Sequence, residues 1–190
     1  MKRLFIAEKP SVAAEFAKAL KVNGQRRDGY VESEDTIVTW CVGHLVTMSY
    51  PDAYDPALKK WSKETLPFLP ETKRYPEPFK YEVIENVRKQ FNIVSGLLNR
   101  DDVETIYVCT DSGREGEYIY RLVDRMANVP AQKDKRRVWI DSQTEEEILR
   151  GINEAKPLTA YDNISFFANV SIFSSILFLA RALSLSFSFA

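Results

Sequence analysis

Near the middle of this chain, an acidic turn joins a short apolar strand to a helix. Residues 104–110 (Glu-Thr-Ile-Tyr-Val-Cys-Thr) are mostly β-branched, aromatic or apolar, which is typical of a strand buried in a parallel sheet. The turn at residues 111–117 reads Asp-Ser-Gly-Arg-Glu-Gly-Glu and contains three acids, Asp111, Glu115 and Glu117. A helix is predicted next, from the apolar stripe of Tyr118, Ile119, Leu122, Val123 and Met126.

The N-terminus repeats this arrangement. Residues 3–7 predict a strand, residues 8–10 (Glu-Lys-Pro) a turn, and Ser11 the N-cap of a second helix. In an open α/β sheet, ligands bind outside the carboxyl ends of the strands. If the two strands are neighbours, Glu8 and Asp111 therefore converge on one crevice. Carboxylate oxygens suit Mg²⁺, which takes one or two carboxylates, keeps several waters and bridges to phosphate.

Three motifs in this order resemble the TOPRIM domain of type IA DNA topoisomerases, with the topoisomerase III branch as the closest match. They are Glu8-Lys-Pro-Ser11, Val42-Gly-His-Leu45 and Thr110-Asp-Ser-Gly-Arg-Glu-Gly-Glu117. The resemblance runs from residue 1 to about residue 163. It implies an α/β, Rossmann-like fold with a mostly parallel sheet flanked by helices, interrupted by a hairpin and an irregular insertion at about residues 23–80.

The resemblance also implies roles for individual residues. Glu8 matches the family's catalytic glutamate, which handles the proton of the attacking or leaving sugar hydroxyl, and Lys9 matches the basic residue that neutralises the scissile phosphate. The implied Mg²⁺ ligands are Glu8, Asp111 and Glu115. The implied contacts to DNA or phosphate are Lys9, His44 and Arg114.

Two features depart from the family pattern. The family motif is Asp-x-Asp-x-Glu, and here Gly113 stands where the second Asp is expected. Without the second Asp, the metal must rely on Asp111 together with Glu8, Glu115 or water, and a weaker affinity is expected. The nucleophilic tyrosine of type IA enzymes is expected in a later domain, far beyond residue 190, so we expect this chain alone to be inactive in strand passage.

Composition indicates one compact intracellular domain. Charged residues make up 28% of the chain and the formal net charge is −1, so DNA contact must depend on local basic patches, for which residues 59–60 and 133–137 are candidates. Cys41 and Cys109 are too isolated for a metal knuckle, and no secretory signal is recognisable. We expect a cytoplasmic, nucleoid-associated monomer that acts on single-stranded DNA segments together with the remaining topoisomerase domains.

Pattern and turn chemistry predict the other elements. Residues 30–33 and 36–41 indicate a hairpin, and residues 81–84 a further strand. A helix is expected over residues 87–98, a strand over 137–140 and a helix over 144–155. A capping box between Thr144 and Glu147 is predicted to start this last helix.

The last segment, residues 164–190, differs sharply from the domain before it. It consists mainly of Phe, Ser, Leu, Ile and Ala, and Arg181 is its single charged residue. We interpret it as an aberrant, frameshifted or misread C-terminus. A membrane anchor is the competing interpretation, because the stretch is long enough to span a bilayer, although membrane attachment is not the one we favour.

The favoured functional hypothesis is the metal-binding domain of an enzyme that transiently cleaves and religates one DNA strand. One alternative is a stand-alone TOPRIM nuclease or primase-like enzyme, which the loss of the second Asp disfavours. Another is a non-catalytic binding or membrane-tethered module, which the apolar tail and Gly113 favour and the intact Glu8, Lys9, Asp111 and Glu115 oppose.

Overall fold

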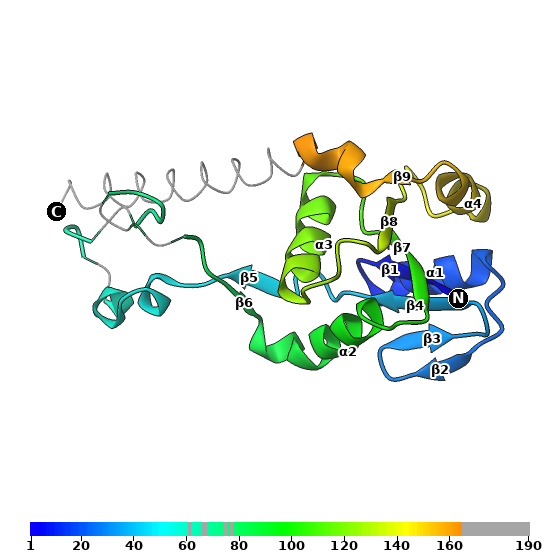
Figure 1. Ribbon diagram of the computed structural model, residues 1–190, viewed down its shortest axis with the longest axis horizontal. Helices are drawn as coiled ribbons and strands as arrows, with labels where there is room; N and C mark the ends of the chain where they lie inside the picture. The colour runs from blue at the N-terminus through cyan, green and yellow to red at the C-terminus, as the bar shows by residue number, and fades with distance from the viewer. Residues whose placement is uncertain (61, 66–67, 74–75, 77, 165–190) are drawn as a thin grey trace.

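The computed structural model describes residues 1–60, 62–65, 68–73, 76 and 78–164, and the chain folds around a seven-stranded sheet of order β2-β3-β4-β1-β7-β8-β9 (Figure 1). The sheet strands are β1 (Lys2–Ala7), β2 (Gln25–Arg27), β3 (Tyr30–Glu32), β4 (Thr36–Trp40), β7 (Val103–Cys109), β8 (Asp134–Arg137) and β9 (Lys156–Pro157). The α-helices are α1 (Pro10–Ala19), α2 (Arg88–Leu98), α3 (Arg114–Met126) and α4 (Glu145–Asn153). Short 3-10 helices are η1 (Pro51–Ala53), η2 (Pro56–Lys59), η3 (Glu85–Val87) and η4 (Leu158–Tyr161).

The four central strands β4, β1, β7 and β8 are parallel, and helices cover both of their faces. Side chains alternate across β1, so that Leu4 and Ile6 join one core while Phe5 and Ala7 join the other. Buried residues of α2 and α3 complete the first core, and those of α1 and α4 complete the second. The expected α/β fold with a mainly parallel, helix-flanked sheet is confirmed.

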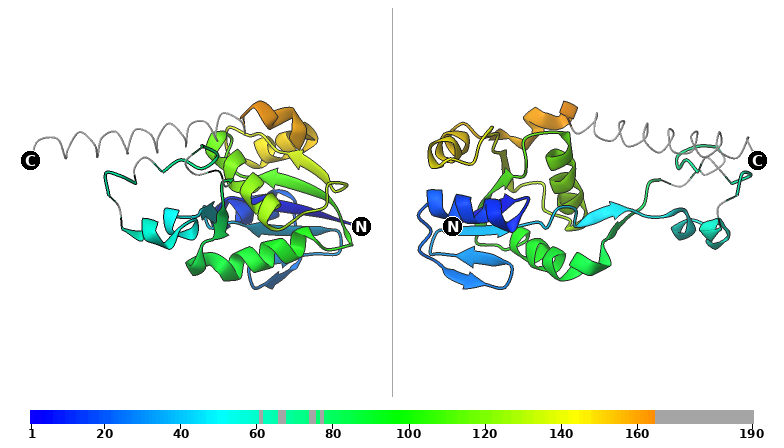
Figure 2. Two further views of the ribbon diagram at one scale, coloured as in Figure 1. Left: turned by 60° about the vertical axis from the view of Figure 1, so that its left-hand side comes forward. Right: turned by 180° about the vertical axis from the view of Figure 1, so that it is seen from behind.

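A separate two-stranded ribbon lies between β4 and α2 in the sequence. It pairs β5 (Val46–Met48) with β6 (Tyr81–Val83) in antiparallel fashion. Both views in Figure 2 show this ribbon reaching away from the main sheet, with η1 and η2 beyond it. The predicted strand at residues 81–84 corresponds to β6, and the irregular stretch that precedes it in sequence contains η1 and η2.

Most of the other predicted elements are confirmed. The strands expected at residues 3–7 and 104–110 are β1 and β7, and the predicted hairpin is the antiparallel pair of β3 and β4. The helix expected over residues 87–98 is α2 together with η3 at its start.

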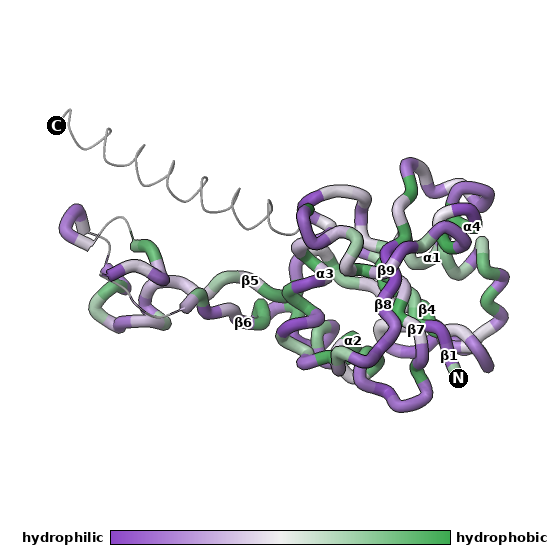
Figure 3. Tube along the Cα trace, turned by 45° about the horizontal axis from the view of Figure 1, so that its top comes forward, coloured by the Kyte–Doolittle hydropathy of each residue, from purple (hydrophilic) through white to green (hydrophobic). Residues whose placement is uncertain are grey.

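The strand predicted at residues 137–140 was placed three residues too late. The structure has β8 at residues 134–137, a sequence of Asp-Lys-Arg-Arg that Figure 3 shows as hydrophilic. This strand is stabilised by its pairing with β7 and by the ion pair between Lys135 and Asp124 at 2.7 Å. The prediction was wrong because it relied on the apolar residues Val138 and Ile140, which lie in the loop that follows the strand.

Two capping predictions need correction. Lys9, and not Ser11, is the N-cap of α1, because Pro10 occupies the first helical position, where its fixed φ and missing N–H are tolerated. At α4, Thr144 Oγ1 accepts the backbone N–H of Glu147 at 3.4 Å as predicted. The Glu147 carboxylate, however, accepts from the backbone N–H of Asp141, so the capping box is not reciprocal.

The apolar segment from residue 165 onward lies outside the described residues, and its interpretation as an aberrant C-terminus stays a prediction. Within the part of the chain that the structure describes, no helix is both long enough and apolar enough to cross a bilayer.

Candidate metal and phosphate site

The site lies at the point where the strand order of the sheet reverses. After β1 the chain continues through α1, β2 and β3 to β4, which pairs with one side of β1. After β7 it continues through α3 to β8, which lies on the other side. The carboxyl ends of β1 and β7 are therefore neighbours at a topological switch point, where α/β sheets bind ligands. Glu8 follows β1 and Asp111 follows β7, so the expected convergence of these two acids is confirmed.

Glu8 is buried, with 6% of its surface exposed, and it contacts both neighbouring loops. Its Oε2 accepts the backbone N–H of Asp111 at 3.2 Å. Its backbone carbonyl accepts the N–H of Gly43 at 3.2 Å, which brings the Gly-His-Leu loop to the same edge of the sheet. Burial, with a smaller contribution from the Glu8 carboxylate, raises the pKa of the Cys41 thiol to about 12, so that Cys41 stays protonated at neutral pH.

Lys9 places a positive charge between the two carboxylates. Its Nζ lies 3.5 Å from Glu8 Oε1 and 3.7 Å from Asp111 Oδ2. A cation thus already lies where oxygens of two acids converge, and the Lys9 and Asp111 side chains are each 55% exposed to solvent. The donor set fits Mg²⁺, because two carboxylates beside open solvent leave positions for water and a phosphate oxygen.

His44 and Glu115 form a second polar pair at the start of α3. His44 Nε2 lies 3.4 Å from Glu115 Oε1, and the His44 ring meets Tyr118 edge-on at 6.2 Å between centroids. Burial raises the pKa of Tyr118 to about 12, so its hydroxyl is neutral at physiological pH. Glu115 is largely exposed, and its side chain can change rotamer without disturbing the core.

The predicted site residues therefore fall into three sets. Glu8, Lys9 and Asp111 are in mutual contact, Glu115 is paired with His44, and Arg114 is exposed without an ion-pair partner in the described part of the chain. Among the residues that the structure describes, no three His, Cys, Asp or Glu side chains are grouped closely enough to hold a metal ion. Glu8 and Asp111 are therefore the two carboxylates that the fold brings together at this point.

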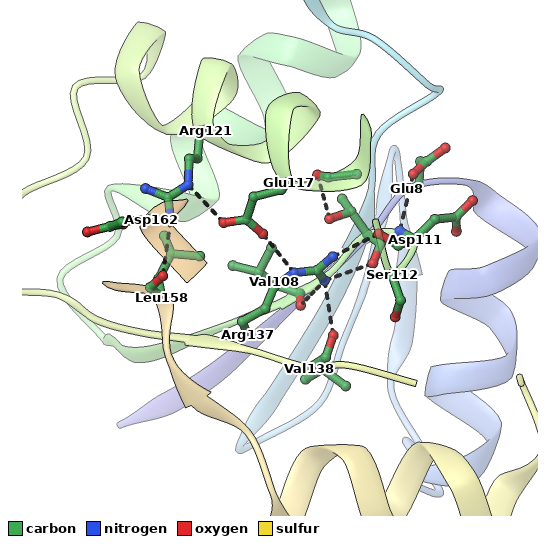
Figure 4. Close-up of polar contacts among 12 residues, drawn as sticks. Glu8, Val108, Asp111, Ser112, Glu117, Arg121, Arg137, Val138, Leu158 and Asp162 are labelled. Carbon is green, nitrogen blue, oxygen red and sulfur yellow. Dashed lines mark hydrogen bonds and ion pairs between the residues drawn. The ribbon is translucent and has the colours of Figure 1, made fainter. Parts of the chain in front are cut away.

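Glu117, the third acid of the turn at residues 111–117, has a structural role that its local spacing did not predict. Its side chain is fully buried, and Oε2 accepts from Nε of the equally buried Arg137 at 2.9 Å (Figure 4). Arg121 Nε donates to the other oxygen at 2.8 Å. Both carboxylate oxygens are thus bonded to arginines of the chain. The one available sequence signal was Arg137, which ends a charged run and directly precedes the apolar residues 138–140.

The basic run at residues 133–137 is less available to DNA than its composition suggested. Lys133 Nζ donates to two backbone carbonyls at 2.6 Å each, and Arg137 is buried. Lys135 and Arg136 pair with neighbouring aspartates. Lys59 and Lys60, by contrast, are exposed, and they stay candidates for phosphate contact.

An open cavity of about 480 Å³ adjoins Asp111 on the α1 side of the sheet. Val12 and Ile140 supply apolar wall, whereas Ser112, Ser142 and Gln143 supply polar groups. Asp111 itself lines this cavity, so the candidate metal position opens onto a space large enough for a nucleotide-sized ligand.

Comparison with known proteins identifies the family of this chain. The Toprim domain family matches residues 3–142. DNA topoisomerase 3 of Bacillus cereus is 45% identical over 164 residues, which cover 86% of this chain and 21% of that protein. DNA topoisomerase 3 of Staphylococcus aureus is 43% identical over 169 residues, which cover 88% of this chain and 22% of that protein.

A solved structure shows the same fold. Full-length topoisomerase I from Thermotoga maritima superposes with a TM-score of 0.50 at 16% identity, over 82% of this chain and 21% of that one. The chain thus spans about a fifth of the proteins it matches. The family match covers most of its length, and the chain belongs to the Toprim domain family, in a form similar to that of the bacterial topoisomerases named DNA topoisomerase 3.

Proposed function

We propose that this chain is the Mg²⁺-binding TOPRIM domain, residues 1–163, of a type IA DNA topoisomerase that cleaves and religates one DNA strand. The observation that carries the proposal is the meeting of Glu8, Lys9 and Asp111 at the switch point of the sheet. Such an arrangement places a proton acceptor, a positive charge and a metal ligand around one open position. We place the enzyme in the cytoplasm with the nucleoid, where its DNA substrate is.

In this proposal each residue has a distinct task. Glu8, whose Oε1 is the oxygen not engaged by the Asp111 N–H, moves the proton of the attacking or leaving hydroxyl. Lys9 leaves the carboxylates to neutralise the scissile phosphate, and His44 and Arg114 contact the backbone nearby. A bound Mg²⁺ ion would supply charge stabilisation at the phosphate, held by Asp111 and Glu8, with Glu115 as a further ligand after a rotamer change.

The nucleophilic tyrosine belongs in this proposal to another domain of the enzyme. Tyr120 is fully buried, and burial raises its pKa well above the ordinary value, while the Tyr118 pKa is raised to about 12. Neither phenol near the acids is suited to attack a phosphodiester as a phenolate. The remaining topoisomerase domains are therefore the partners that we propose, and a monomer is sufficient.

A domain exchange tests the proposal directly. Residues 1–163 would replace the matching segment of Bacillus cereus DNA topoisomerase 3, and relaxation of negatively supercoiled DNA would be measured with Mg²⁺. We expect the chimera to relax DNA. Glu8→Gln should lower the rate by at least about 100-fold, the range typical of a lost acid–base group. Asp111→Asn, which removes the charge of a proposed metal ligand, should lower the rate as well. Glu145→Gln, an exposed acid on α4, is the matched control and should have no effect.

The same variants in the 190-residue chain separate the alternatives. The isolated chain should leave labelled single-stranded DNA uncut, with or without Mg²⁺. Metal-dependent cutting that Asp111→Asn abolishes would instead indicate a self-sufficient nuclease. An inactive chimera that folds and still binds DNA would favour a non-catalytic binding module.

A further inference from the structure

Among the residues that the structure describes, Arg137 is the largest completely buried side chain, and it lies directly behind the candidate metal site. It is the last residue of β8, and its guanidinium pairs with Glu117 from α3 at 2.9 Å (Figure 4). Burial lowers the pKa of Arg137, while Glu117 acts in the opposite direction and keeps the guanidinium charged. The charge is therefore internal and is not offered to DNA.

The rest of the guanidinium is directed at backbone carbonyls around Asp111. Nη2 donates to the Asp111 carbonyl at 2.8 Å, and Nη1 donates to the Thr110 carbonyl at 2.8 Å. Further bonds of 3.0 Å from Nη1 reach the carbonyls of Val108 and Val138. One planar group thus joins the end of β7, the start of the acidic loop and the residue after β8.

Two other contacts hold this loop from the α3 side. Thr110 Oγ1 donates to the Gly116 carbonyl at 2.8 Å, and a Cβ atom at Gly116 would lie 2.1 Å from the Asp111 carbonyl oxygen. The Asp111 backbone is therefore enclosed between Arg137 and the first turn of α3. The Asp111 carboxylate is 55% exposed, so the backbone is fixed while the side chain faces solvent.

Stability alone is a weak explanation for this arrangement. A buried ion pair is often no more stabilising than apolar side chains of similar volume, because two charges lose their hydration. Lysine would keep the charge opposite Glu117, but its single ammonium lacks the fork that reaches four carbonyls. What the guanidinium adds is a fixed geometry for the residues on either side of Asp111.

We propose that Arg137 is a positioning residue, which orients Asp111 toward the cation through hydrogen bonds to the backbone of the acidic loop. This inference rests on the proposed function, because it assigns Arg137 a task in the metal site of that function. Groups that orient metal ligands from outside the coordination sphere typically change metal affinity by about 10- to 100-fold when they are removed.

Two variants of the 190-residue chain test it. Arg137→Lys keeps the buried charge and removes the fork. The double variant Arg137→Met with Glu117→Gln removes both buried charges, so that neither is left without its partner. Leu98→Ala, which truncates a fully buried side chain at the opposite end of the sheet, serves as the control for lost stability.

Two properties would be measured below the melting temperature of all variants. The first is amide hydrogen exchange over residues 110–113, and the second is Mn²⁺ affinity from electron paramagnetic resonance. We expect both Arg137 variants to exchange faster in this segment and to bind Mn²⁺ about 10- to 100-fold more weakly. Leu98→Ala should lower the melting temperature and leave both properties unchanged.

The outcomes separate this inference from the proposed function. Folded Arg137 variants with native exchange and native Mn²⁺ affinity would overturn the positioning role. Equal changes in Leu98→Ala would overturn it as well, since they would reflect stability alone. If the wild-type chain binds no Mn²⁺, the proposed metal site is overturned. Faster exchange in the Arg137 variants would then still show that Arg137 holds the backbone of the loop.

Discussion

Glu8 Oε2 accepts the backbone N–H of Asp111 at 3.2 Å, although 103 positions separate the two residues in the chain. The bond crosses from the end of β1 to the end of β7, two parallel neighbours in the sheet. The second acid of the site is thus fixed by the first as well as by its own strand. Glu8 therefore has a part in loop geometry in addition to the proton transfer proposed for it.

Replacing Lys9 should change metal binding and DNA binding in opposite directions. Its ammonium lies within 3.7 Å of both carboxylates and competes with a divalent cation for them. We expect Lys9→Met to raise Mn²⁺ affinity several-fold, measured by electron paramagnetic resonance. The same variant should weaken binding of single-stranded DNA, with a slope of log affinity against log salt that is smaller by about one charge, because one phosphate contact is lost.

Lys18→Met is the matched control for Lys9, since Lys18 lies on the exposed face of α1 and pairs with Glu15 at 4.0 Å. It should leave both affinities unchanged. Weaker Mn²⁺ binding in Lys9→Met would mean that Lys9 organises the carboxylates and does not compete for them.

Two glycines on α-helices should respond to alanine with opposite signs. A Cβ atom at Gly116 would lie 2.1 Å from the Asp111 carbonyl oxygen, whereas one at Gly96 on α2 meets no atom within 4 Å. We expect Gly116→Ala to destabilise the fold by about 2 kcal/mol or more through overpacking. Gly96→Ala should stabilise it by about 0.5–1 kcal/mol through helix propensity. Urea unfolding followed by circular dichroism measures both, and a neutral Gly116→Ala would contradict the tight approach of the loop.

The sequence predicts a strand of this fold correctly where the strand's own residues carry an apolar pattern, and less well where the strand depends on contacts with distant residues. β1 is buried on both faces, and its continuous apolar run made it recognisable. β8, by contrast, is stabilised as a strand by its hydrogen bonds to β7 and by the buried ion pair between Arg137 and Glu117. Those contacts come from residues that are distant in sequence, so local pattern placed the strand three residues too late.

The candidate site shows the same limit. Strand ends predicted the meeting of Glu8 and Asp111, because parallel neighbours bring their carboxyl ends to one edge. Spacing in the sequence did not show that Glu117, the third acid of the turn, would be buried. Its burial follows from the rotation of α3, which turns residue 117 toward Arg137 and leaves residue 115 beside His44.

Gly113 offers a direct test of the metal site. Its φ of 165° is extended backbone that any residue adopts, and a Cβ atom there meets nothing within 4 Å. We expect Gly113→Asp, which restores the family's second Asp, to fold normally and to bind Mn²⁺ about tenfold more tightly, because ligand charge tunes affinity. Gly113→Asn has nearly the same shape without the charge, and equal affinity of the two variants would place residue 113 outside the ion's reach.

At the amino end of β7, away from the candidate site, Arg100 should make the free energy of unfolding depend on pH. Its Nη2 lies 2.8 Å from Glu32 Oε1 and 2.7 Å from Asp102 Oδ2. The hydrogen bond from Arg100 lowers the pKa of Asp102. Burial acts to raise the pKa of Glu32, but hydrogen bonds from Lys2 and Arg100 together lower it. The stability from both carboxylates is therefore present above their ordinary pKa values and is lost as pH falls through the lower values of the folded state.

Arg100→Met should consequently cost about 1 kcal/mol at neutral pH, or about 2–4 °C in melting temperature. The difference from the wild type should shrink as pH falls from about 5 to about 3, where the carboxylates become protonated. Urea unfolding at a series of pH values measures this convergence. Arg136→Met, whose pair with Asp134 is more exposed, is the control and should change little at any pH. Parallel stability curves for Arg100→Met and the wild type would show that the bonds of Arg100 do not control the titration of Glu32 and Asp102.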